Sequence, residues 1–248
     1  MKPKSETLFH FTKNLDTLQL ILDSGFWPRY CLEDIQWLSG ESQTEEGFVS
    51  VPMVCFCDIP LSRIDEHVNF YGSYGLGMTK EWALKSGLAP VHYVTQSSPF
   101  TTTFARVCQL TMEASGNETS ESWKLVRRLV MYMKPLTGTM SIGAEPISKD
   151  FYQESEWRYI AIDDAVEPFL LTPEHLDTDK QKAANDATRA HCMLKFLPSD
   201  VRYIFVRADT DIPPLMNFIQ SKLDHYPAAE LKLLMSRVTS LESVRRDW

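Results

Sequence analysis

Apolar and polar positions in the first half of the chain repeat with the two periods that distinguish strands from helices. Apolar and polar side chains alternate over residues 9–12, which predicts a short strand over 8–12. Residues 15–22 carry leucine and isoleucine at helical spacing, and Gly25 is placed to end that helix as a C-cap. The apolar, β-branched run 51–57 predicts a buried strand. The same signals predict helices over 62–70 and 79–86, with Ser62 and Thr79 as N-caps, and a strand over 91–95.

The second half continues with a mixture of both kinds of element. Ser98 followed by Pro99 predicts the start of a helix that runs to about residue 114. Strands and helices then interleave without a regular alternation, which indicates an α+β fold. The remaining expectations are helices over 120–133, 213–223 and 227–238, strands over 157–162, 193–196 and 202–206, and polar surface loops over 39–47 and 177–185.

The composition is that of a soluble globular protein. Of 248 residues, 44% are hydrophobic and 23% charged, and we expect one domain over 1–248 with the C-terminal helices 211–248 packed on it. No apolar run approaches the roughly 18 residues of a membrane span, and no apolar segment follows the basic start of the chain. The five cysteines, an odd number, fit a reducing compartment. We therefore expect a cytoplasmic protein with no membrane partner.

The formal net charge of -8 means that the chain as a whole repels nucleic acid. A local basic cluster can still dominate close contact, and Lys124, Arg127, Arg128 and Lys134 form the best one. These four side chains are either a nucleic-acid contact or the solvated face of a helix.

The opening strand places two polar side chains on one face. Because side chains alternate along a strand, His10 and Thr12 point to the same side, with Phe9 and Phe11 toward the core. His10 could donate to or accept from a ribose hydroxyl while Thr12 holds a neighbouring polar group. The alternative is a structural histidine that is satisfied by the backbone.

A second constellation lies at the predicted strand near residue 157. Glu154 and Glu156 are two residues apart and are expected on one strand face. A carboxylate pair there could stabilise the positively charged, oxocarbenium-like sugar that forms when an N-glycosidic bond breaks. The alternative is a strand with solvated glutamates that pair with Arg158.

A third constellation is the segment 71–78, which carries three glycines and two tyrosines. It lacks the phosphate-loop pattern, so it does not predict nucleoside-triphosphate binding. Tyr71 or Tyr74 could stack on a flat ring such as nicotinamide, while glycine lets the backbone approach the ligand. The alternative is a tight turn packed by aromatic side chains.

Three blocks of sequence, taken together, resemble a known family. They are LFHFT over 8–12, VPMVCFCDIPLS over 51–62 with YGSYGLGMTKEW over 71–82, and YQESEWRY over 152–159. The combination resembles the AbiGi family of bacterial abortive-infection phage-resistance proteins, and the resemblance extends from about residue 7 to about residue 207. The family implies phage defence, and its members have also been labelled antitoxins.

A weaker similarity suggests a chemistry. The His-x-Thr strand, the helix ending in glycine, the aromatic block and the Glu-x-Glu strand look like the ADP-ribosyltransferase superfamily, including its DarT type. By that similarity His10 would bind the ribose of NAD, Glu156 would be catalytic, and Glu154 would orient the acceptor. Tyr71 or Tyr74 would stack on nicotinamide. This sequence departs from the superfamily in lacking its Ser-Thr-Ser strand motif.

The same similarity implies a binding site for the rest of NAD. Arg29 and Arg158 would bind its pyrophosphate, since arginine pairs bidentately with phosphate. The similarity also implies a mixed β-sheet core with flanking helices, of the ADP-ribosyltransferase type, and no metal.

These observations predict an NAD-dependent ADP-ribosyltransferase toxin of an abortive-infection system. Its target would be a macromolecule, with nucleic acid narrowly favoured over protein. A cognate antitoxin is expected as a partner, with a chaperone as a further candidate. The alternative from another class is a non-enzymatic antitoxin that binds and neutralises a partner toxin. A third alternative, a metal-dependent nuclease, would have to draw its ligands from Asp58, Asp65 and His67.

Overall fold

The computed structural model describes residues 5–38, 47–115, 120–142 and 145–246. The chain divides into two compact units, between which it passes four times. Unit 1 comprises 1–27, 55–88 and 193–248, and unit 2 comprises 28–54 and 89–192. Both units combine helices with strands, so the predicted α+β class is confirmed. The expectation of a single domain and the likeness to the ADP-ribosyltransferase core both stay predictions.

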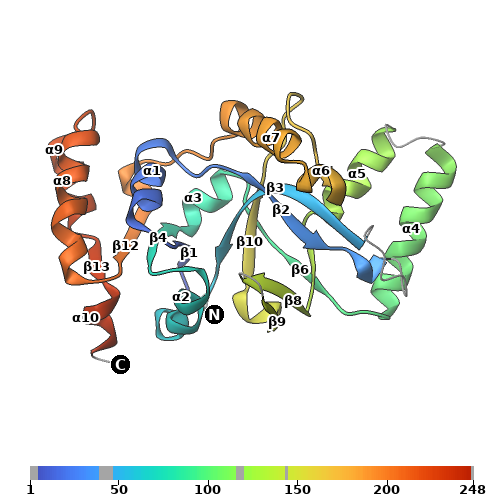
Figure 1. Cartoon of the computed structure of the whole chain (residues 1–248), viewed down its shortest axis with the longest axis horizontal. Helices are drawn as coiled ribbons and strands as arrows, with labels where there is room; N and C mark the ends of the chain where they lie inside the picture. The colour runs from blue at the N-terminus through green and yellow to red at the C-terminus, as the bar shows by residue number, and fades with distance from the viewer. Residues whose placement is uncertain (1–4, 39–46, 116–119, 143–144, 247–248) are drawn as a thin grey trace. The chain divides into compact units, whose positions relative to one another are not determined.

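Unit 1 is built on a mixed sheet. Its strands are β1 (Thr7–Thr12), β4 (Tyr74–Thr79), β12 (Val201–Val206) and β13 (Val238–Ser240), joined by the end of β3 (Phe48–Cys57). The order is β13-β12-β4-β1-β3, in which β12 and β13 run parallel and the other neighbours antiparallel (Figure 1). The predicted strands over 8–12 and 202–206 are therefore confirmed.

The glycine-rich segment is the centre of this sheet and not a loop. All of Tyr74–Met78 is buried in β4. A Cβ added to Gly75 would lie 2.5 Å from the Phe11 ring, and one added to Gly77 would lie 2.9 Å from the Phe9 ring. These glycines leave room for aromatic rings of the neighbouring strand, so both the ligand-facing loop and the tight turn were wrong.

The helices of unit 1 begin and end largely where the sequence predicts. The Asn14 side chain accepts from Thr17 N at the start of α1 (Leu15–Ser24), and Gly25, at φ 85°, ends it. Thr79 caps α3 (Lys80–Lys85) as expected. Ser62 does not cap α2 (Ile64–Tyr71), because a 3-10 turn over Leu61–Arg63 precedes it. The C-terminal helices are α8 (Ile212–Lys222), α9 (Ala228–Met235) and α10 (Leu241–Arg245), with further 3-10 turns at Pro198–Asp200 and Asp209–Asp211.

Unit 2 has its strands in three groups. The first part of β3 pairs with β2 (Arg29–Asp34) and β11 (Leu170–Leu171) and neighbours β10 (Glu156–Ile160), which pairs with β5 (Ala89–Pro90). Beside these lie the parallel pair β6 (His92–Val94) and β7 (Met133–Pro135) and the hairpin of β8 (Thr137–Ile142) and β9 (Glu145–Asp150).

The helices of unit 2 include one that the sequence analysis missed. Residues 178–191, expected in part as a polar loop, form α7 (Thr178–His191), which Asp177 caps. Its buried side chains, Asn185 and Thr188, are polar and are satisfied by hydrogen bonds. Asn185 accepts from Tyr30 N, and Thr188 donates to Pro28 O. The others are α4 (Pro99–Ser115), α5 (Glu121–Val130) and α6 (Thr172–Leu176), with 3-10 turns at Gln36–Leu38 and Phe151–Glu154.

Three further expectations have mixed outcomes. The predicted strand over 193–196 is wrong, since only Leu194 forms an isolated bridge, with Phe26. The predicted loop over 39–47 lies outside the described residues except for Gly47. Among the described helices, none has both the length and the apolarity that crossing a bilayer requires.

Candidate functional site

The two predicted catalytic glutamates do not share a strand face. Glu154 ends the 3-10 turn, and Glu156 is the first residue of β10. Ser155 between them adopts a left-handed conformation with φ 45°, which breaks the strand alternation on which the prediction relied. Both carboxylates are nevertheless buried, so the alternative of solvated glutamates is also wrong.

Glu156 is held by two cations inside unit 2. Its Oε1 accepts from Arg158 Nε at 2.6 Å and its Oε2 from Lys134 Nζ at 2.7 Å. Burial by itself raises the pKa of Glu156, but the charges of Arg158 and Lys134 outweigh burial and hold that pKa well below its usual value. The carboxylate is therefore ionised and already paired.

Arg158 is the largest fully buried side chain in the described structure, with 0% exposed. Besides Glu156, its guanidinium donates to Glu33 Oε2 at 2.5 Å and to Met131 O at 2.7 Å. The predicted pairing of Arg158 with glutamate is confirmed for Glu156. An arginine bound in this way is oriented by its own fold and not by a pyrophosphate group.

Two lysines complete the cluster. Lys134 Nζ lies 3.6 Å from Glu154 Oε2 and 4.5 Å from the centre of the Phe151 ring, and Lys149 forms an ion pair with Glu154. Burial lowers the pKa of Lys134, but Glu33 and Glu156 outweigh burial and raise it. Three acidic and three basic side chains thus balance in a buried charge network: Glu33, Lys134, Lys149, Glu154, Glu156 and Arg158.

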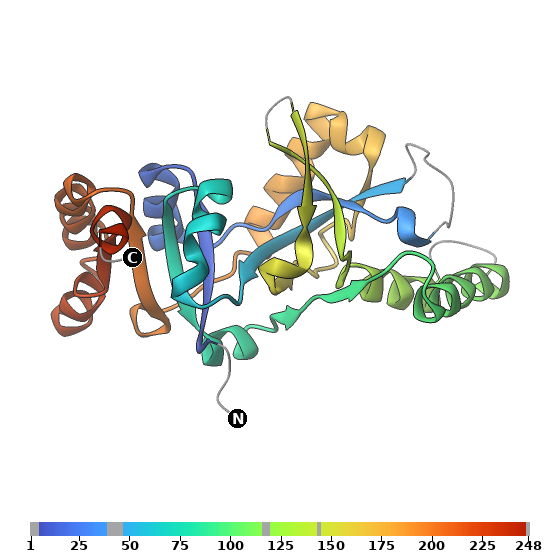
Figure 2. The same ribbon diagram turned by 90° about the horizontal axis from the view of Figure 1, so that it is seen from below.

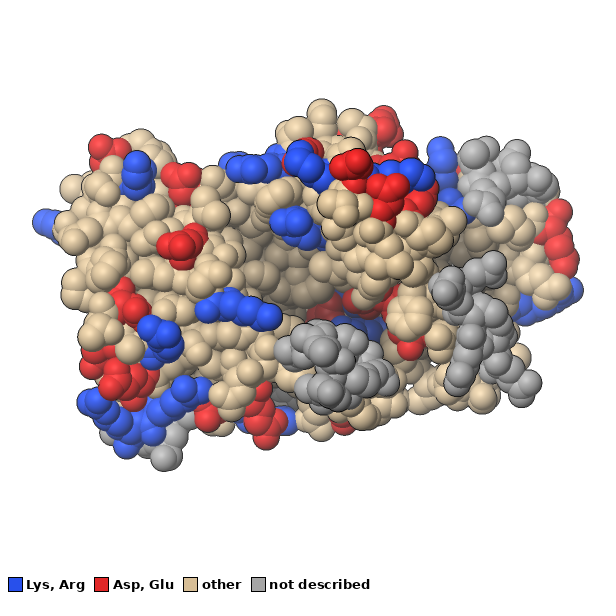
Figure 3. All heavy atoms as spheres, viewed as in Figure 1, with Lys and Arg blue, Asp and Glu red and all other residues tan. Residues whose placement is uncertain are grey.

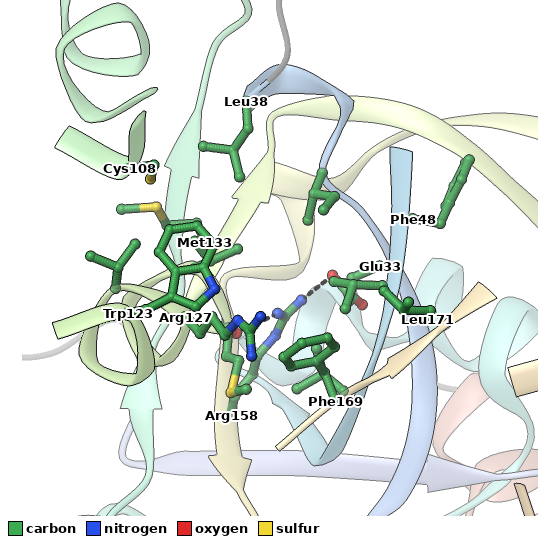
Figure 4. Close-up of a pocket in the computed structure, with 16 residues that line it drawn as sticks. Glu33, Leu38, Phe48, Cys108, Trp123, Arg127, Met133, Arg158, Phe169 and Leu171 are labelled. Atoms are coloured by element: carbon green, nitrogen blue, oxygen red, sulfur yellow. Dashed lines mark hydrogen bonds and ion pairs between the residues drawn. The ribbon is translucent and has the colours of Figure 1, made fainter. Parts of the chain in front are cut away.

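A cavity of about 280 Å³ opens beside this network (Figure 4). Glu33 and Arg158 reach it from the network, whereas Glu154 and Glu156 are not among its lining residues. The rest of the wall is mainly apolar and comes from β2, β3, α4, α5, β7 and the β11 region. A few charged side chains, here including Arg127, in a mainly apolar wall are the usual composition of a small-ligand site.

In unit 1, His10 is bonded to the backbone. Its Nδ1 lies 2.8 Å from Cys55 O, and since a carbonyl only accepts, Nδ1 carries the hydrogen. The ring packs against Phe26 and Phe56, with centroids 5.2 and 5.5 Å away. Burial lowers the pKa of His10, so the ring is neutral. These contacts match the structural alternative; Thr12, half-buried, follows on the same strand.

The tyrosine candidates also belong to unit 1. Tyr74 is buried and donates from its hydroxyl to Asp211 Oδ2 at 3.0 Å, so it offers little surface to a nicotinamide ring. Tyr71 is half-buried, and the centre of its ring lies 4.4 Å from the centre of the His67 ring. The predicted site thus divides between the units, with Arg29 exposed at the start of β2 in unit 2. The proximity of His10 and Glu156 stays a prediction.

Only some side chains of the predicted basic cluster are exposed on the surface. Lys134 is buried in the charge network, and Arg127 lies 4.3 Å over the Phe169 ring. Lys124 and Arg128 are exposed on α5, where they line a pocket together with Asp163 and Asp164. Basic and acidic side chains are also interspersed over the face drawn in Figure 3. For Lys124 and Arg128, the solvated helix face is the better description.

The residues of the nuclease alternative are engaged elsewhere. Asp58 pairs with Lys80 at 2.7 Å, and Asp65 pairs with Arg245 at 2.6 Å. Within the described residues, no group of three or more histidine, cysteine, aspartate or glutamate side chains is placed to hold a metal ion.

Sequence reasoning missed three members of the charge network: Glu33, Lys134 and Lys149. Glu33 is 125 positions from Arg158, and nothing in its neighbourhood indicates that pairing. Lys134 carried a signal, because it stands between Met133 and Pro135 in an apolar strand, where a solvated lysine is out of place.

Comparison with known proteins decides the family. A family model described as "Putative abortive phage resistance protein AbiGi, antitoxin" matches residues 24–207. The chain belongs to the AbiGi family. An AbiGi relative from Lactococcus lactis subsp. cremoris, named abortive phage resistance protein AbiGi, is 30% identical over an alignment that covers 90% of this chain and 100% of the relative. No solved structure matches this AbiGi chain. The family resemblance seen in the sequence is therefore confirmed, and the similarity to ADP-ribosyltransferases is not.

Proposed function

We propose that this AbiGi protein is a non-enzymatic antitoxin, which binds a partner toxin and neutralises it within an abortive-infection system. The family description, which includes the word antitoxin, supports this proposal. The buried charge network supports it as well, because the carboxylates that catalysis would need are already paired with cations. The expected partner is then a toxin and not an antitoxin.

The observation that carries the proposal is the apolar surface of α4 and α5. These two helices, both drawn in green in Figure 2, contact each other. In the described part of α4, Thr101 is the single buried side chain, although the helix has 17 residues. Large apolar side chains that α4 and α5 leave exposed are Phe100, Val107, Leu110, Leu125 and Leu129.

Such a surface suits a protein partner better than nucleic acid. When another apolar surface covers exposed leucine and phenylalanine, the complex is stabilised by roughly 25 cal/mol per Å² of apolar surface buried. Nucleic acid presents negatively charged phosphates instead. Asp163 and Asp164, which lie next to Lys124 and Arg128, would repel these phosphates. We call the five exposed apolar side chains of α4 and α5 the apolar helix surface.

The predicted transfer of ADP-ribose from NAD would require a rearrangement of the charge network. Glu156 would have to approach the ribose C1, which requires its ion pairs with Arg158 and Lys134 to open. Opening a buried ion pair leaves charges uncompensated at a cost of about 3–5 kcal/mol. The antitoxin proposal requires no such rearrangement.

Growth rescue tests the proposal. Cells express a candidate partner toxin together with wild-type protein or with the double variant Leu110→Asp, Leu129→Asp. We expect wild type to restore growth and the variant to lose at least tenfold in surviving cells, because two charges on the apolar helix surface must be desolvated on binding.

The matched control is Leu20→Asp, Leu84→Asp, which places the same charges on exposed leucines of unit 1. This control should rescue like wild type, with both variants present at wild-type levels on a blot. Label transfer from radioactive NAD to any macromolecule by the wild-type protein would instead support the ADP-ribosyltransferase prediction. Failure of wild type to rescue growth would overturn the antitoxin proposal.

A further inference from the structure

The cavity beside the charge network has a donor that lacks an acceptor. Trp123 Nε1 is fully buried and has no hydrogen-bond partner within the part of the chain that the structure describes. The indole lines the cavity from α5. A buried donor without an acceptor is unfavourable, so the arrangement is stabilised by any molecule that supplies an acceptor.

Cationic groups surround that donor. Figure 4 shows the indole nitrogen of Trp123 and the guanidinium groups of Arg127 and Arg158 turned toward the same part of the cavity. Arg127 lies 4.3 Å over Phe169 and 5.3 Å from Trp123. Glu33 is the acidic side chain in the wall, and one of its oxygens already accepts from Arg158. The N–H of Trp123 and the guanidinium of Arg127 therefore make this part of the wall favour an oxygen acceptor.

The apolar part of the wall defines the rest of the ligand. Phe169, Phe48 and Val126 stand among the mainly apolar residues that line the cavity. Its volume of about 280 Å³ lies just below the usual range of 300–1,000 Å³ for small-molecule sites. A molecule of one or two fused rings fills such a space, and its ring faces can stack on tryptophan and phenylalanine.

We propose that this cavity binds a small aromatic carboxylate. The ring system lies among the apolar side chains, and the carboxylate accepts from Trp123 Nε1 beside the arginines. A carboxylate is favoured over a neutral carbonyl because the guanidinium of Arg127 lines the cavity beside Trp123, whereas the charge of Arg158 is already balanced by Glu33 and Glu156. The side chains of α4 and α5 that line the cavity are not those of the apolar helix surface, so this proposal stands whether or not the antitoxin proposal holds.

Calorimetric titration of the full chain with 2-naphthoate tests the proposal. Naphthalene, which has the same rings but no oxygen, is the comparison. We expect 2-naphthoate to bind with one site per chain and at least about tenfold more tightly than naphthalene, because only the acid satisfies the buried donor. The Trp123→Phe variant keeps an aromatic wall and removes the donor, so it should bind 2-naphthoate about tenfold more weakly.

Trp37→Phe is the matched control. Trp37 Nε1 is also buried without a partner among the described residues, but its indole lines a different pocket. This variant should bind 2-naphthoate like wild type, and both variants should leave the affinity for naphthalene unchanged. The proposal is overturned if 2-naphthoate gives no saturable binding, if naphthalene binds equally well, or if Trp123→Phe binds the acid as tightly as wild type.

Discussion

At the residue scale, Arg158 and Glu156 depend on each other. A buried charge without its partner is costly, whereas an exposed pair contributes little. Replacing Arg158 by Met should therefore lower the free energy of unfolding by about 3–5 kcal/mol, since Glu33 and Glu156 lose a shared cation. Urea unfolding followed by circular dichroism measures this loss.

Arg202→Met is the control for that experiment, because Arg202 pairs with Glu6 at 3.3 Å on an exposed surface. It should change stability by less than about 1 kcal/mol. Equal unfolding midpoints for the two variants would contradict a stabilising role for the charge network.

A second prediction at this scale concerns pH. Unfolded His10 takes up a proton near its ordinary pKa of 6.5, whereas burial lowers the pKa of folded His10. Between the two values the unfolded state binds more protons, so stability falls as the pH drops below about 6.5. The His10→Gln variant should show a shallower fall between about pH 7 and pH 5 in thermal unfolding.

His175 keeps part of that slope in the variant, because burial lowers its pKa as well. Glu156 contributes in a lower range: its pKa is depressed in the folded state, so its stabilisation is lost as the pH falls below about 4.5. An unchanged slope above pH 5 in His10→Gln would show that His10 is not protonated on unfolding in this range.

The sequence allowed some of these contacts to be predicted and not others. The pairing of Glu156 with Arg158 follows from strand alternation, which places both on one face. Their burial did not follow, because charged side chains are usually solvated and the sequence does not indicate which partners neutralise them. The backbone acceptor of His10, Cys55 O, lies 45 residues away and is set by sheet pairing alone.

At the scale of elements, Gly72 marks a close contact after α2. It has φ 124°, and an added Cβ would lie 2.2 Å from Thr12 O. Gly72→Ala should lower the free energy of unfolding by at least about 2 kcal/mol, because the backbone conformation and the contact both oppose a side chain. Chemical denaturation of the purified variant measures this loss.

Gly87 is the matched control at positive φ. It has φ 77°, but no atom lies within 4 Å of an added Cβ. Gly87→Ala should therefore cost only about 1 kcal/mol, from the backbone conformation alone. An equal loss in the free energy of unfolding for both variants would show that the close contact between Gly72 and Thr12 does not affect stability.

Elements with local start and stop signals were predicted well. Thr79 caps its helix and Gly25 ends another as the sequence indicated. The strand β4 was missed, because glycine is unfavourable in strands unless neighbouring rings need the space, and those rings come from β1 and β12. Helix α7 was missed because its buried face is made of Asn185 and Thr188, which a search for apolar periodicity passes over.

At the scale of the whole molecule, each unit is assembled from segments that are far apart in the chain. Unit 1 combines the first 27 residues with 55–88 and the last 56, which run over 193–248. Local patterns do not encode such pairings, so the strand order could not be predicted from the sequence. Family membership could be predicted, because its motifs are contiguous and the family model matches 24–207.

The central claim is that this AbiGi protein acts by binding. A calorimetric titration of the purified chain into the purified partner toxin that it neutralises in the growth assay, with NAD absent, tests this directly. We expect saturable binding at a fixed stoichiometry, with a Kd of about 1 μM or tighter that Leu110→Asp, Leu129→Asp weakens at least tenfold. No binding by a chain that still rescues growth would contradict it.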